Sequence, residues 1–166
     1  MAIFRPLPSL AIAAVRASAP RVETPAVLYG VVTCDGILPL LNQLQTLPPG
    51  DAVFFYPADP MLPFLTGRRY PVRLDMLLPQ YSTPAQYQET CRQLMQEAQW
   101  VVSHVEITQP DFYRAVFPAM TNPLPPEKMA FEASLDAAFV HVGTYDGFQL
   151  MRRAAADVAL CDEIIR

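Results

Sequence analysis

Lysine is nearly absent from this chain, and charged residues of both signs are scarce. Lys128 is the only lysine among twelve basic residues, the net charge is -4, and charged residues make up 17% of the chain. Typical globular domains contain about 25% charged residues. A nucleic-acid-binding domain would have clustered basic residues and a high pI, so this composition argues against nucleic acid as a partner. The low charge also indicates a domain with one face covered by a larger body.

Long apolar runs are missing as well. The longest one near the N-terminus, Leu10 to Val15, is far shorter than the roughly 20 residues that span a bilayer. The preceding Pro6-Leu7-Pro8 interrupts the apolar core that a signal peptide needs. We therefore expect a soluble chain that neither spans a membrane nor directs its own export.

Cysteine and histidine are too few and too scattered for a zinc site. The chain has two histidines and three cysteines, Cys34, Cys91 and Cys161, with no Cys-x-x-Cys pair, so no metal is expected. An odd number excludes a complete set of disulfides within one chain, although one bridge plus a free thiol remains open. The favoured interpretation is that all three are buried, inert thiols, because free cysteine behaves as a small apolar residue.

Glycine is also scarce, and no phosphate-binding glycine loop is present. The six glycines form neither a Gly-x-Gly-x-x-Gly nor a Walker-type sequence, and no Gly-x-Ser-x-Gly motif marks a serine hydrolase. We therefore expect no nucleotide or other cofactor, and no catalytic residue is assigned.

What is present indicates one domain in 166 residues. Four prolines in the first 25 residues predict an extended arm or linker, followed by a single domain over 26–153 and a tail over 154–166. The pattern predicts a three-layer, Rossmann-like α/β fold with a mostly parallel sheet and an antiparallel hairpin at its C-terminal edge. The expected strands are 26–33, 52–56, 100–107, 139–145 and 148–152, and the expected helices begin near residues 37, 83, 110, 126 and 154.

Two local signals support these elements. Thr83-Pro84-Ala85-Gln86 has the spacing of a capping box with proline at the first helical position. Asp146-Gly147 separates two β-rich runs and supplies the positive φ angles of a tight hairpin turn. The sequence thus predicts where the longest helix begins and where the hairpin turns.

An arginine cluster forms the main binding hypothesis. Arg68, Arg69 and Arg73 follow Tyr56 and Asp59, and guanidinium groups suit phosphate or carboxylate recognition. The sequence therefore suggests these five residues as a binding site for a phosphorylated group or a sugar. The alternative is a solvated loop held by arginine–aspartate pairs.

His104 and Glu106 are a weaker candidate. They lie two apart on a predicted strand, so they would share one face and could act as acid and base. The favoured interpretation is a polar pair at the rim of the sheet. A similar edge position is expected for His141.

Several ordered blocks resemble one bacterial family. The blocks are Gly50-Asp-Ala-Val-Phe-Phe-Tyr-Pro57, Pro60-Met-Leu-Pro-Phe-Leu-Thr-Gly-Arg68, 79–89, Trp100-Val-Val102, Phe117-Pro118 and 148–153. Together they resemble the C-terminal soluble region of polytopic membrane glycosyltransferases of the dolichyl-phosphate-mannose-protein mannosyltransferase type. The resemblance implies a domain at the extracytoplasmic face of the bacterial inner membrane, with sugar transfer from a polyprenyl-phosphate carrier in the membrane part.

We therefore expect a non-catalytic accessory domain that helps to position acceptor or carrier. Its partners would be the transmembrane domain and possibly polyprenyl phosphate or glycan. One alternative is a free-standing soluble enzyme with a cleft at the carboxyl ends of the strands, where Tyr56, Asp59 and His104 would be the candidate residues. Another is a protein-interaction module.

Overall fold

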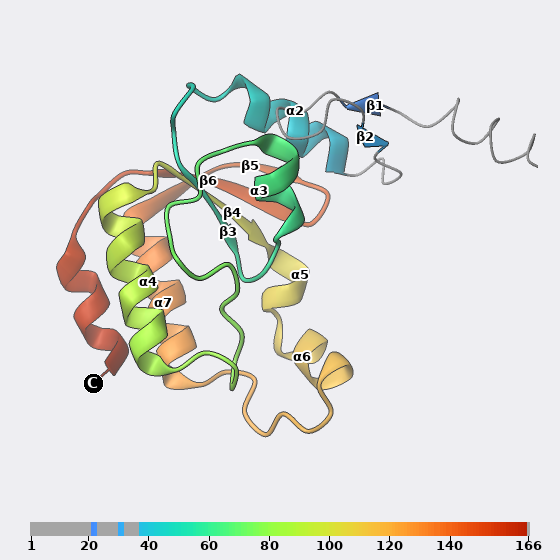
Figure 1. Ribbon diagram of the computed structural model, residues 1–166. Coiled ribbons are helices and arrows are strands. Elements are labelled where there is room, and N and C mark those ends of the chain that lie inside the picture. Colours follow the sequence, from blue (N-terminus) through green and yellow to red (C-terminus); the bar gives the residue numbers. More distant parts are fainter. Residues whose placement is uncertain (1–20, 23–29, 32–36, 166) are drawn as a thin grey trace, which may run out of the picture.

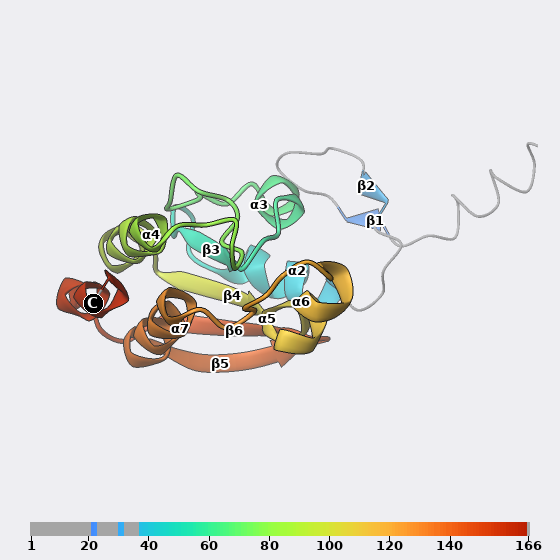
Figure 2. The same ribbon diagram turned by 90° about the horizontal axis from the view of Figure 1, so that it is seen from below.

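Four strands form a mixed sheet in the computed structural model, which describes residues 21–22, 30–31 and 37–165. The strands are β3 (Val53–Tyr56), β4 (Trp100–His104), β5 (Phe139–Tyr145) and β6 (Phe148–Arg153), in the spatial order β3-β4-β6-β5. Figure 2 shows them side by side in this order. The α/β class and the hairpin at the C-terminal edge are confirmed.

The expectation of a mostly parallel sheet is wrong for these four strands. Only β3 and β4 run parallel, whereas β6 is antiparallel to both β4 and β5. The physical reason is the hairpin: Asp146 and Gly147 adopt φ angles of 39° and 84°, which reverse the chain in two residues. Strand β6 then pairs with β4 through its other edge and leaves β5 outermost.

Helices cover both faces of this sheet (Figure 1). One face is covered by α2 (Leu38–Thr46) and α3 (Met61–Thr66), and the other by α4 (Pro84–Glu97), α7 (Pro126–Ala138) and the 3₁₀ helix η2 (Val158–Ile165). Two short helices, α5 (Val105–Thr108) and α6 (Pro110–Val116), follow β4. In the described part of the chain, none of these helices is both long and apolar enough to cross a bilayer.

The two faces follow from the alternation of side chains along each strand. Phe54 and Val101 face a core that contains residues of α4, α7 and η2. Phe55 and Val102, each one residue later, face a second core formed with α2 and α3. Because both faces are buried, β3 is an unbroken apolar run, as a doubly covered strand requires.

The capping box predicted for the longest helix is confirmed. The side chain of Gln86 accepts a hydrogen bond from the Thr83 N–H at 2.8 Å, and the Thr83 hydroxyl accepts one from the Gln86 N–H at 3.3 Å. Helix α4 therefore begins with two of its free backbone donors satisfied. Its predicted apolar face is buried, including Tyr87 and Leu94.

The predicted strand over 100–107 ends three residues early. Strand β4 stops at His104, and Val105 begins the helix α5. Glu106 therefore lies on a helix, so the predicted strand face shared by His104 and Glu106 is wrong.

The predicted first core strand, 26–33, falls mainly on residues outside the described part of the chain. Its two described residues, Gly30–Val31 (β2), pair antiparallel with Arg21–Val22 (β1) in a separate two-stranded sheet. Cys34 and most of the predicted arm also lie outside the described residues, so the arm and its boundary stay predictions.

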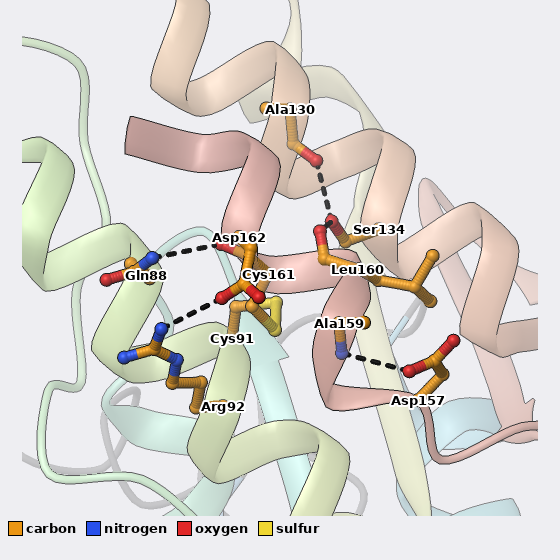
Figure 3. Close-up of a disulfide and its surroundings, with 10 residues drawn as sticks. All are labelled: Gln88, Cys91, Arg92, Ala130, Ser134, Asp157, Ala159, Leu160, Cys161 and Asp162. Carbon is orange, nitrogen blue, oxygen red and sulfur yellow. Dashed lines mark hydrogen bonds and ion pairs between the residues drawn. A yellow bond between two sulfur atoms is a disulfide. The ribbon is translucent and has the colours of Figure 1, made fainter. Parts of the chain in front are cut away.

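A disulfide holds the C-terminal helix η2 against α4. Cys91 and Cys161 are bonded, with 5.7 Å between their Cα atoms, and both are fully buried (Figure 3). Arg92 and Asp162 add an ion pair at 2.9 Å beside it. The expectation that these two cysteines are free thiols is therefore wrong, because the helix packing brings residues 70 positions apart into bonding geometry.

Candidate functional site

Polar side chains line up across the sheet at the carboxyl ends of β3 and β4. Tyr56, the last residue of β3, lies opposite Ser103 on β4, and Ser103 lies opposite Gln149 on β6. Residues paired in this way point to the same face of a sheet. Open α/β sheets place ligands outside the carboxyl ends of their strands, so this row occupies a favourable position for a site.

Helix α7 contributes a buried ion pair to the same place. Lys128 Nζ donates to Glu132 Oε1 at 2.7 Å and to the Thr108 carbonyl at 3.1 Å. The Tyr56 hydroxyl donates to the same Glu132 Oε1 at 2.9 Å. The Lys128 side chain is 1% exposed, so these hydrogen-bond partners replace the water molecules that its ammonium loses on burial.

A cavity of about 520 Å³ opens beside this network. Ser103, Lys128, Glu132, Asp136 and Gln149 line it together with apolar side chains of the surrounding elements. Its size is in the range of small-molecule sites, about 300–1,000 Å³. This cavity, here called the α7 pocket, combines a concave shape with polar groups on several elements and is the best candidate site.

Three tyrosines around Glu132 stay protonated. Burial raises the pKa of Tyr56, Tyr87 and Tyr113 above the ordinary value, and the Glu132 carboxylate raises each further. The hydroxyls of Tyr87 and Tyr113 are buried and have no hydrogen-bond partner among the described residues. Protonated phenols donate hydrogen bonds, so these three tyrosines are hydrogen-bond donors and not bases.

Arg68 lies far from this pocket and has a structural role. Its guanidinium donates to the carbonyls of Leu44, Gln45, Leu47 and Pro48 at the end of α2. The last carbonyls of a helix have no donor four residues later within it, and the Leu44 carbonyl otherwise accepts a longer bond from the Leu47 N–H at 3.4 Å. Arg68 therefore caps α2 from another part of the chain.

Arg69 and Arg73 are each paired with a different carboxylate of α4. Arg69 forms an ion pair with Glu97 at 2.7 Å, and Arg73 forms one with Glu89 at 3.3 Å. Arg68 and Arg69 lie at the amino end of β3, because Arg69 bridges to Ala52, whereas Tyr56 is at the carboxyl end. The structure therefore places Arg68 and Arg69 at the opposite end of β3 from Tyr56, and it pairs Arg73 with α4.

Asp59 and His104 lie near each other, on the side of the strand ends away from the α7 pocket. Asp59 Oδ1 accepts a hydrogen bond from the Leu62 N–H at 3.2 Å, which satisfies a free donor of α3. Burial raises the pKa of Asp59, and the backbone hydrogen bond and His104 partly oppose that rise. The His104 ring packs against Phe148 with 4.2 Å between ring centroids. The position of His141 at the edge is confirmed: it is exposed on β5 and contacts the Thr144 hydroxyl.

Sequence reasoning found Tyr56 but missed Lys128 and Glu132. A usable signal was present, because Lys128 is the only lysine and Glu132 follows four residues later, at the spacing of a helical ion pair. Over the described residues, no three His, Cys, Asp or Glu side chains come together as a metal site would require. No protein-family model, curated protein or solved structure matches this chain.

Proposed function

We propose that this chain is a non-catalytic accessory domain of a polyprenyl-phosphate-dependent membrane glycosyltransferase, positioned at the extracytoplasmic face of the membrane. The proposal starts from the resemblance of blocks such as Gly50–Pro57 and Trp100–Val102. The observation that carries it is the buried Cys91–Cys161 disulfide. Disulfides form and persist in oxidising compartments and are rare in the cytosol, which supports an extracytoplasmic position.

In this proposal, the α7 pocket holds part of the acceptor or of the lipid-linked carrier. Glu132 Oε1 is already occupied by donors from Lys128 and Tyr56, which fixes the carboxylate in one orientation. Such pre-organised polar groups favour recognition. We further propose a Rossmann-like, three-layer arrangement, supported by helices on both faces and by the parallel unit β3–α4–β4.

The test uses the chain produced in an oxidising and in a reducing compartment. We expect Cys91 and Cys161 to resist alkylation in protein from the oxidising compartment, and this protein to bind vesicles that contain polyprenyl phosphate or to bind the membrane domain supplied in detergent. The cytosolic protein, with free thiols, should be less stable. Absence of binding to carrier, glycan and membrane domain alike would contradict the proposed function.

A second candidate, a free-standing enzyme, is favoured by one observation. The α7 pocket lies at the carboxyl ends of the parallel pair β3–β4, and Glu132 is 30% exposed in it. Open α/β sheets commonly place their active sites there. Turnover of a small substrate by the isolated chain, lost on Glu132→Gln, would favour this reading over the accessory domain.

A further inference from the structure

Two carboxylates of helix α7, Glu132 and Asp136, line the α7 pocket, and Lys128 is ion-paired with only the first of them. Glu132 uses Oε1 for Lys128 and Tyr56, and its Oε2 has no partner among the described residues. Asp136, four residues later, lines the same pocket and has no hydrogen bond or ion pair within the described part of the chain. Like charges at this helical spacing repel each other.

Lys128 neutralises only one of these two charges. Its ammonium contacts Glu132 Oε1 and the Thr108 carbonyl, and it lies 5.8 Å from the centroid of the Tyr113 ring. The ammonium therefore already has a carboxylate, a carbonyl and an aromatic ring as neighbours. The charged lining of the pocket consists of one ammonium and two carboxylates, so its net charge is -1.

The rest of the lining offers further hydrogen-bonding groups and an apolar surface. The side chains of Ser103 and Gln149 lie on adjacent strands at the sheet end of the pocket, and neither makes a hydrogen bond within the described part of the chain. Leu124 and Met151 supply apolar contact. A ligand with a polar end and a short carbon skeleton can satisfy both kinds of surface.

We propose that the α7 pocket binds a small ligand that carries a protonated amine, with the ammonium between Glu132 Oε2 and the Asp136 carboxylate. A cation there offsets the net negative charge of the lining, and it does so beside the half-buried Glu132 carboxylate, where charge interactions exceed their strength in water. A phosphate would meet two carboxylates and a lysine that is already paired. This inference rests on the proposed role of the pocket and assigns it the amine-bearing part of a ligand instead of the phosphate of the carrier.

The test compares three small probes on the full 166-residue chain by NMR titration at low salt: 2-aminoethanol, ethylene glycol and inorganic phosphate. The amine and the glycol differ essentially in the charged group. We expect saturable shifts of the Ser103 and Gln149 amide resonances with 2-aminoethanol alone. Added salt should weaken this binding, because ions screen charge pairs.

Asp136→Asn is the decisive variant, since its side chain is exposed and makes no hydrogen bond or ion pair within the described part of the chain. It should weaken 2-aminoethanol binding about fivefold, the effect of losing one partly exposed charge partner. Asp75→Asn, an exposed carboxylate outside the pocket, is the matched control and should leave the affinity unchanged.

Four outcomes would overturn the proposal: no saturable shift with the amine, equal binding of ethylene glycol, preferential binding of phosphate, or an unchanged affinity in Asp136→Asn. The accessory-domain proposal is tested separately by the binding of polyprenyl-phosphate vesicles or the membrane domain. If the chain binds those partners but not 2-aminoethanol, only the proposal of an amine ligand is refuted. If the chain binds 2-aminoethanol but none of those partners, only the proposal of an accessory domain is refuted.

Discussion

Breaking the Cys91–Cys161 disulfide should strongly destabilise the fold. The bond joins residues 70 positions apart in the sequence. Closing a loop of this length removes about 15 cal/mol/K of entropy from the unfolded chain, which corresponds to about 4 kcal/mol at 25 °C. Because total stability is typically 5–15 kcal/mol, the reduced protein should lose a large fraction of its resistance to unfolding.

Urea unfolding of oxidised and reduced protein measures this effect. The reduced form is prepared by adding reductant in urea and refolding without an oxidant, which leaves both sulfur atoms in place and avoids the cavity that Cys→Ala would create. The same difference should appear in a Cys34→Ala variant, since the expected bridge does not involve that residue. Alkylation of Cys91 and Cys161 in the folded, oxidised protein would refute the disulfide. A change of less than about 1 kcal/mol in the free energy of unfolding on reduction would refute its stabilising role.

Three further predictions concern single sites. Glu132→Ala should lower the free energy of unfolding by about 3 kcal/mol, because it leaves the buried Lys128 ammonium unpaired; urea unfolding should show most of this loss restored when Lys128→Met is added. Thr83→Ala should cost about 1 kcal/mol by the same assay, because it removes a helix cap, and an unchanged midpoint would contradict the capping role. Burial raises the pKa of Asp59 above the ordinary aspartate value of about 4. The wild type therefore loses stability as the pH rises from below this ordinary value through the higher pKa of the folded state, because the buried carboxyl group must then ionise. Asp59→Asn keeps an oxygen for the Leu62 N–H and should raise the Tm relative to the wild type at pH 7 but not at pH 3; a gain of equal size at both pH values would refute the role of the charge.

Local signals predicted the elements well. The capping residues of α4, the Asp-Gly turn and the apolar stripe of α2 are each encoded within a few neighbouring residues, so their positions could be read from the sequence. The pairing of β6 with β4 could not, because it depends on which sheet edge the hairpin meets after it has formed. The end of β4 was also missed. Val105 and Ile107 have side chains that favour strands, yet they lie in the helix α5.

The candidate site was only partly predictable. Tyr56 was found because it ends a recognisable strand, but its partner Glu132 lies 76 residues away and is brought to it by the packing of α7 on the sheet. The three arginines are close in sequence, which suggested a shared ligand. In the fold their long side chains reach three different partners, namely the end of α2, Glu97 and Glu89. Proximity along the chain is a weak guide for residues with this reach.

The contact between Arg68 and the end of α2 predicts which two substitutions should occur together in relatives of this chain. The helix ends at Thr46 and is followed by Leu47 in an extended conformation, without a C-terminal glycine and without a basic residue in its last turn. The guanidinium of Arg68 takes over that role from 20 residues or more downstream. Across related sequences, the arginine should therefore disappear where the helix gains a glycine at its end and persist where it does not.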